Sequence, residues 1–174
     1  MDKTNYNNLS LIGEGGHGKI YSLCNERCIK VCKKTKNMKK EYGVLKIIEG
    51  YPQFPVVYEC KDNYMIREYI DGPNIKEYIT ENGLSNNLAK ELTELIKIFI
   101  KFKFKRIDVK MHEVFITEKD KFKIIDTTRY LDKKATYPFK MLRSLEHLGY
   151  KDQYMNFLKG NYPEFFELWD KTNK

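Results

Sequence analysis

The sequence lacks an apolar run long enough to cross a membrane. Lysines interrupt the longest apolar stretches well before the ~20 residues that a spanning helix needs. Residues 1–8 are polar and do not resemble the apolar core of a secretory leader. Internal repeats and low-complexity linkers are also absent. For 174 residues we therefore expect a cytoplasmic globular protein without a membrane partner, built as one domain or as two small lobes sharing a cleft.

The four cysteines lack the Cys-x-x-Cys spacing that zinc sites commonly use. Cys24, Cys28 and Cys32 follow one another at intervals of four, but a hairpin turn is expected at Asn25-Glu26. We therefore expect these three and Cys60 to be reduced, small, buried residues of strands.

Acidic residues are outnumbered. The chain has 32 lysines and arginines against 24 aspartates and glutamates, for a net charge of +8. Such an excess favours acidic partners, namely nucleotides, nucleic acid or an acidic protein, without choosing among them. A lysine-rich solvated surface explains the charge equally well. The run Lys33, Lys34, Lys36, Lys39 and Lys40 is interpreted in the same two ways, with a solvated loop ahead of the next helix as the simpler one.

Alternating and helical apolar patterns divide the chain into two halves. The first half reads as strands at 8–13, 19–23, 28–32, 56–60 and 64–69, with one helix at 38–48. The second half reads as helices at 74–80, 87–102 and from about 139 onward, with a break at 161–163 and short strands at 114–117 and 122–125. The aromatic residues of the tail, between 150 and 169, are predicted to form a core. This order predicts an α+β fold with segregated elements.

Glycines at 13, 15 and 18 lie between two strand-like segments. A dinucleotide-binding loop would lead into a helix, whereas residues 19–23 are too short and too β-prone for one. A strand–loop–strand hairpin of this kind can place its backbone amides over phosphates, because glycine has no side chain in the way. The alternative is an ordinary glycine-rich hairpin, with His17 exposed at its tip.

Charged residues further along add chemistry to this loop. Lys30 lies mid-strand between apolar neighbours and needs a partner or an anion, which Glu41 on the next helix can supply. Asp108 follows the long helix, and Asp126 ends a strand 18 residues later, with a hairpin between them. An exposed strand lysine is the alternative for Lys30.

This order of parts resembles the protein-kinase superfamily over residues 9–130. Residues 64–72, Tyr-Met-Ile-Arg-Glu-Tyr-Ile-Asp-Gly, resemble the kinase hinge, whose backbone hydrogen-bonds adenine. The resemblance implies ATP and Mg²⁺ as cofactors. The implied nucleotide-binding residues are Gly13, Gly15, Gly18, Lys30, Glu41, Glu68, Tyr69 and Ile70, the implied catalytic residues are Asp108 and Lys110, and the implied metal ligands are Asp126 and Glu113.

The resemblance also implies what each group does. Lys30 would pair with the α- and β-phosphates and with Glu41, and Asp108 would orient or accept the proton of the attacking hydroxyl. Lys110 would touch the transferred phosphate. Asp126 would hold magnesium, a hard cation that prefers carboxylate oxygen.

The chain departs from the family pattern in several places. Residues 106–108 read Arg-Ile-Asp for His-Arg-Asp, Glu113 replaces an asparagine, and 126–128 read Asp-Thr-Thr for Asp-Phe-Gly. A one-residue shift would instead leave His112 or Glu113 on the surface. Only 48 residues follow Asp126. We therefore expect a two-lobed fold with a β-rich N-lobe (1–70) and a truncated helical C-lobe (71–174), similar to small atypical kinases of the RIO and Bud32 type or to short bacterial Ser/Thr-kinase-like proteins.

Three functions are compatible with these residues. The first is a serine/threonine-type phosphotransferase that uses ATP and Mg²⁺ on a protein or on itself. The second is a pseudokinase-type scaffold or switch that binds the nucleotide without efficient transfer. The third is an atypical kinase that acts on a small molecule or associates with RNA.

Overall fold

In the computed structural model, which describes residues 8–117 and 121–170, most of the first half of the chain folds into a five-stranded antiparallel sheet. The strand order is β1-β2-β3-β5-β4. The strands are β1 (Leu11–Gly15), β2 (Gly18–Leu23), β3 (Arg27–Cys32), β4 (Val57–Lys61) and β5 (Tyr64–Glu68). Helix α1 (Thr35–Ile47) is inserted between β3 and β4.

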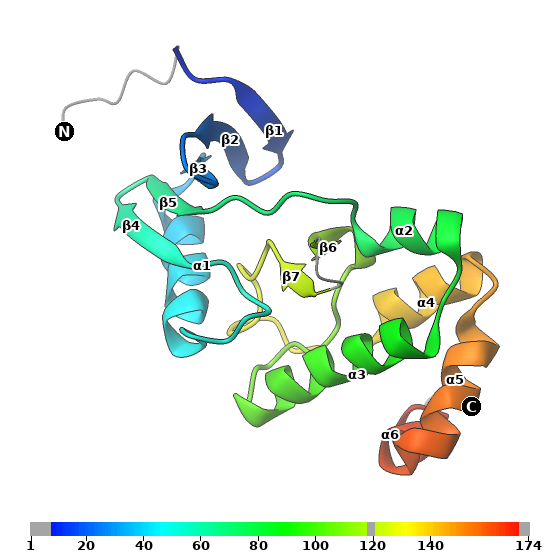
Figure 1. Cartoon of the computed structure of the whole chain (residues 1–174). Coiled ribbons are helices and arrows are strands. Elements are labelled where there is room, and N and C mark those ends of the chain that lie inside the picture. The colour runs from blue at the N-terminus through cyan, green and yellow to red at the C-terminus, as the bar shows by residue number, and fades with distance from the viewer. Residues whose placement is uncertain (1–7, 118–120, 171–174) are drawn as a thin grey trace.

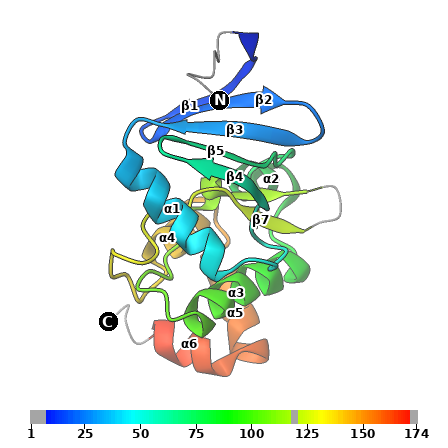
Figure 2. The same cartoon turned by 90° about the vertical axis from the view of Figure 1, so that its left-hand side faces the viewer.

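Helices dominate the second half. They are α2 (Ile75–Asn82), α3 (Asn86–Lys101), the short 3₁₀ helix η2 (Met111–Glu113), α4 (Phe139–His147), α5 (Lys151–Asn161) and α6 (Pro163–Asp170). Strands β6 (Val114–Ile116) and β7 (Phe122–Ile124) form a separate hairpin. The sheet and α1 lie at one end of the molecule and α3, α5 and α6 at the other (Figure 1, Figure 2). The expected α+β pattern with segregated elements is thus confirmed.

Short sequence signals set several element ends. Asn25 and Glu26 have φ angles of 60° and 54°, so the predicted turn between β2 and β3 contains two residues with left-handed backbone, and the pairing of Leu23 with Arg27 makes it a three-residue loop. Asn74 accepts hydrogen bonds from two backbone amides at the start of α2, in a capping box with Glu77. Ser85 caps α3 in the same way, through the amide of Leu88.

Three expectations need correction. Helix α1 begins at Thr35 and not at Met38, so Lys36 lies on the helix with Lys39 and Lys40 instead of in a loop ahead of it. Cys24 is exposed because it lies in the β2–β3 turn, whereas the other cysteines are buried or half-buried as predicted.

The third correction concerns the tail, which forms three helices where the sequence suggested one break. Gly149, with φ of 80°, ends α4 because its N–H donates to the carbonyl of Glu146 while that of Tyr150 donates to Leu145. This is a Schellman motif, which favours glycine at the left-handed position.

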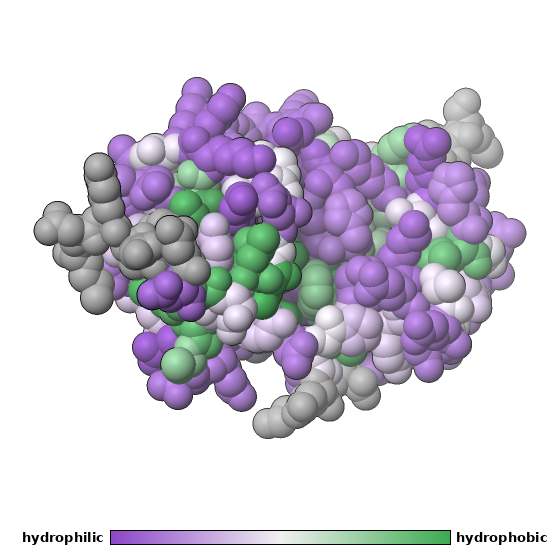
Figure 3. Space-filling view, turned by 90° about the horizontal axis from the view of Figure 1, so that it is seen from above, coloured by the Kyte–Doolittle hydropathy of each residue, from purple (hydrophilic) through white to green (hydrophobic). Residues whose placement is uncertain are grey.

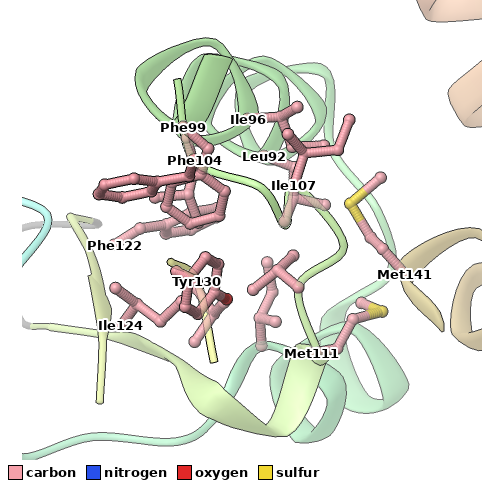
Figure 4. Close-up of a cluster of buried hydrophobic side chains, with 14 of the residues drawn as sticks. Leu92, Ile96, Phe99, Phe104, Ile107, Met111, Phe122, Ile124, Tyr130 and Met141 are labelled. Carbon is pink, nitrogen blue, oxygen red and sulfur yellow. The ribbon is translucent and has the colours of Figure 1, made fainter. Parts of the chain in front are cut away.

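One apolar face of α3 organises the core. Leu92, Ile96 and Phe99 are buried and point toward the chain segment that follows the helix (Figure 4). They pack with Phe104, Ile107, Met111, Phe122, Ile124, Tyr130 and Met141 (Figure 4). This packing holds residues 104–130, which contain the predicted catalytic and metal-binding residues, in one place.

The aromatic residues of the tail extend this core, as predicted. Tyr154, Phe165 and Trp169 are buried, and four others are partly buried against the core. Within the described residues, no helix is both long and apolar enough to span a membrane. Seen from above, the surface is mostly hydrophilic, with a hydrophobic patch near its middle (Figure 3).

Candidate functional site

Lys30 and Glu41 form a buried ion pair between the sheet and α1. The Nζ of Lys30 lies 2.5 Å from Oε2 of Glu41, and both side chains are almost fully buried. Lys30 lies on β3 next to Ile29 and is paired across the sheet with Met65 of β5. Both of these apolar neighbours are buried. A buried ammonium and carboxylate each need the other, so this pair fixes α1 against the sheet.

Arg67 on β5 is a second partner of Glu41, and the sequence expectations omitted it. Its Nη1 lies 3.2 Å from Oε1 of Glu41 and 2.7 Å from the carbonyl oxygen of Ile125, next to Asp126. Only 3% of Arg67 is exposed. Its sequence signal was weaker than that of Lys30, because Arg67 is the next-to-last residue of β5 and precedes a second charged residue, Glu68.

The glycine loop between β1 and β2 rests on neighbouring backbone. A Cβ atom on Gly18 would lie 2.0 Å from the carbonyl oxygen of Val31, so only glycine fits there without a shift. A Cβ on Gly13 would make ordinary contact with Ile20, and one on Gly15 would meet nothing within 4 Å. The loop tip is linked to α1, because Nδ1 of His17 lies 3.1 Å from Nδ2 of Asn37. His17 is accordingly half-buried and not exposed as expected.

Beneath this loop lies a pocket of about 370 Å³, here called the phosphate pocket. Its walls include Gly13, Gly15 and Gly18 from the loop, Lys30 from β3, Lys110 and Glu113 near η2, and Asp126 after β7. The sequence expectations drew these residues from four separate segments. The fold brings all of them onto one cavity, together with Arg67, His112 and Ile125.

The two carboxylates of the phosphate pocket differ in electrostatics. Burial and the negative charge of Asp126 both raise the pKa of Glu113. The ion pair with Lys110 acts in the opposite direction but does not cancel the rise. Burial also acts on Asp126, but the positive charge of Lys30 and hydrogen bonds from Thr128 outweigh it, so the pKa of Asp126 lies below its ordinary value. Asp126 is therefore the firmly ionised member of the pair.

Asp108 does not line the phosphate pocket, although Lys110, two residues further along the chain, does. Asp108 is 4% exposed, and its oxygens accept hydrogen bonds from the backbone N–H of Lys140 (2.7 Å) and from Nη2 of Arg106 (3.0 Å). Burial raises its pKa, although these donors act in the opposite direction. Asp108 thus holds the start of α4 in place through the N–H of Lys140.

A second, largely apolar pocket of about 220 Å³ adjoins the loop, and it is called the base pocket below. Side chains of Ile12, Ile20 and Cys28 from the sheet and of Ile70, Phe115 and Ile125 from the following segments line it. Its walls provide two apolar surfaces, which is the environment that the flat face of a nucleobase prefers.

Glu68, Tyr69 and Ile70, which the kinase resemblance assigns to the hinge, line the base pocket. Both side-chain oxygens of Glu68 are within 2.6 Å of Nζ of Lys123, and the N–H of Tyr69 donates to the carbonyl of Glu26. The N–H of Ile70 donates to no group within the described residues, which leaves it available to a ligand.

Comparisons with known proteins add one distant relative. The chain is 22% identical over 149 residues to "Putative serine/threonine-protein kinase YrzF" of Bacillus subtilis (strain 168), a match that covers 82% of this chain and 69% of the relative. No protein-family model matches the chain. The match supports a kinase-like relationship at most, and the α+β architecture with its antiparallel sheet is consistent with a small kinase-like fold.

Proposed function

We propose that the protein is an ATP- and Mg²⁺-dependent phosphotransferase with a small, two-lobed kinase-like architecture and a serine or threonine hydroxyl as acceptor. The observation that carries this proposal is the phosphate pocket, where Lys30, Lys110 and Asp126 meet beneath the glycine loop. The base pocket beside it supplies room for adenine. The distant relative named as a serine/threonine kinase adds support.

The donor set of the phosphate pocket fits a magnesium nucleotide. Lys30 and Lys110 are cations that can contact phosphate oxygens, and the glycine loop lines the same pocket, where its backbone amides would be potential donors to phosphate. Asp126 and Glu113 offer the carboxylate oxygens that Mg²⁺ prefers. Bound magnesium would neutralise phosphate charge. The chain itself would bind and align the reactants, which is the main protein contribution to phosphoryl transfer.

Adenine recognition would use the base pocket and the free backbone N–H of Ile70. The apolar side chains of Ile20, Phe115 and Ile125 would cover the faces of the base. The N–H of Ile70 would donate to a ring nitrogen. Tyr69 would serve mainly to hold the hinge against the β2–β3 turn, because its own N–H is already paired.

A nucleotide-binding switch without efficient transfer is the second candidate, and the geometry of Asp108 favours it. Both Asp108 oxygens already accept hydrogen bonds from Arg106 and Lys140. Asp108 is also only 4% exposed and does not line the phosphate pocket. If this position persists with ATP bound, its carboxylate does not reach the acceptor hydroxyl. The protein would then bind ATP and change conformation without transferring phosphate.

Phosphate transfer from labelled ATP separates the two candidates. The purified chain is incubated with Mg²⁺, ATP labelled at the γ-phosphate and a mixture of serine- and threonine-containing peptides. Asp126→Ala tests the metal site, and Asp152→Ala, an exposed carboxylate on α5, is the matched control. The enzyme proposal expects label in protein or peptide for wild type and control, and none for Asp126→Ala. ATP-dependent thermal stabilisation with no transfer by wild type would favour the switch.

A further inference from the structure

A groove of about 570 Å³ lies beside the phosphate pocket and is lined mainly by cationic side chains. It runs between the start of α1 and the segment that follows Asp126. We call it the basic groove. Its basic residues are His17, Lys33, Lys34, Lys40, Arg129 and Lys133.

Little of this charge is neutralised by the protein. Asp132 is the one carboxylate on the groove, and it pairs with Lys40. Lys34, Arg129 and Lys133 are exposed and form no ion pair within the described part of the chain. Lys33 donates to the carbonyl oxygen of Gly15, at 3.3 Å, so its charge also remains without a counterion. The groove therefore presents a surplus of positive charge to any ligand.

Helix α1 adds to this surplus. Its N-cap residue, Lys34, makes no side-chain capping bond, and its first turn contains no acidic residue. Lysines at the positive end of a helix dipole are unfavourable unless an anion lies nearby. The lysines at the start of α1 are therefore electrostatically unfavourable on this wall of the groove, and a bound carboxylate would reduce the repulsion.

The basic groove leads into the proposed reaction centre. His17 and Arg129 line both the groove and a small cavity that also contains Lys110 and Asp126. The same cavity is bordered by Arg106 and Lys140. That cavity holds only about 20 Å³. The groove also shares Gly16 and His17 with the phosphate pocket, whose wall includes Lys110, so a chain lying in the groove can place one side chain near Lys110 by that route while its neighbours stay among the cations.

We propose that the basic groove seats an acidic polypeptide segment that flanks the acceptor hydroxyl. This inference rests on the proposed function, and it narrows the acceptor to serine or threonine with aspartate or glutamate nearby. Lysine ammonium groups are compact point charges that suit separate carboxylates. Among the described residues, none of those that line the groove is Phe, Tyr or Trp, the side chains that usually stack on the bases of single-stranded RNA.

The test measures binding of labelled probes to the full chain. The probes are a short fluorescent peptide with one serine flanked by glutamates, the same peptide with glutamines, and a single-stranded RNA of similar length. The groove variant is Lys33→Glu/Arg129→Glu/Lys133→Glu. The matched control is Lys76→Glu/Lys90→Glu/Lys159→Glu, which changes the net charge equally at exposed sites on α2, α3 and α5.

We expect the acidic peptide to bind at least about tenfold more tightly than the glutamine peptide, a difference of about 1.4 kcal/mol. The groove variant should lose this preference and the control variant should keep it. Equal loss in both variants would overturn the proposal, because it would show a general charge effect. Tighter binding of RNA than of the acidic peptide would also overturn it. If the groove variant does not fold, Lys133→Glu alone, with Lys159→Glu as its control, provides the same comparison.

ATP binding by the same variants distinguishes this inference from the function on which it rests. Thermal stabilisation by ATP and Mg²⁺ without any preference for the acidic peptide would overturn the groove proposal alone. A preference for the acidic peptide that the groove variant loses, without any response to ATP, would support the groove and contradict the phosphotransferase. The two failures are therefore separable.

Discussion

Arg67 and Glu41 form an ion pair of 3.2 Å that is buried between β5 and α1. The same arginine donates to the carbonyl of Ile125 at 2.7 Å, which ties α1 to the residue before Asp126. Lys30 completes the cluster from β3. Three segments that contribute to the phosphate pocket are thus joined through one glutamate and one arginine.

Replacement of Arg67 by methionine should weaken this cluster. Glu41 would keep Lys30, but the Ile125 carbonyl would lose its donor, and a buried polar group without a partner costs about 1–3 kcal/mol. Urea unfolding of Arg67→Met measures the loss. The control is Lys151→Met, which breaks a pair with Glu146 that is largely exposed and should cost less than about 1 kcal/mol. Equal losses in the two variants would contradict the role assigned to Arg67.

Two glycines of the loop should respond differently to alanine. Gly18→Ala places a Cβ atom 2.0 Å from the Val31 carbonyl and 2.9 Å from Cα of Cys32, so the backbone must shift. We expect a loss of about 1–3 kcal/mol in stability. Gly15→Ala meets nothing within 4 Å and should change stability by less than about 0.5 kcal/mol. Because Gly15 faces the phosphate pocket, its substitution should instead weaken ATP binding. Thermal unfolding with and without ATP checks both expectations.

Asp108 should leave a signature in the pH dependence of stability. Burial raises its pKa in the folded protein, so the folded state holds this proton to a higher pH than the unfolded state does. The stability that the protonated carboxyl contributes is fully present below pH ~3.9, the ordinary pKa of aspartate. It is lost as the pH rises through the raised pKa of Asp108.

Asp108→Asn removes this titration and keeps an oxygen for the N–H of Lys140. The stability of wild type relative to Asp108→Asn should therefore fall as pH rises from ~4, as measured by urea unfolding at successive pH values. A difference that stays constant, or that grows with pH, would show that Asp108 is not held in the buried position described above.

Periodic patterns predicted most of the fold. Alternating apolar residues located the five strands of the sheet, and the apolar face of Leu92, Ile96 and Phe99 located α3. The break at Gly149 was missed because a lone glycine in a helical pattern is compatible with both continuation and a Schellman end. The start of α1 was placed late because lysines carry no apolar signal.

The candidate site was predicted from the sequence as far as the identity of its charged groups. Lys30, Lys110, Asp126 and Glu113 were selected by their order along the chain, and the fold places them on one pocket. The partners of Asp108 could not be predicted, because the N–H of Lys140 reaches it from α4, 32 residues away in sequence. Such contacts depend on tertiary packing and not on local pattern. Arg67 was overlooked because it lies beside Glu68 near the end of β5, where the sequence pattern does not single out one buried charge.

Binding of ATP in the presence and absence of Mg²⁺, measured by calorimetry for wild type and Asp126→Asn, tests the central claim most directly. Asp126 is the carboxylate of the phosphate pocket whose pKa lies below its ordinary value, so it is ionised at neutral pH and able to hold the cation. We predict that Mg²⁺ strengthens ATP binding to wild type and to the Asp152→Asn control, and that Asp126→Asn removes this Mg²⁺ effect. Failure of wild type to bind ATP, or an unchanged Mg²⁺ effect in Asp126→Asn, would contradict the account.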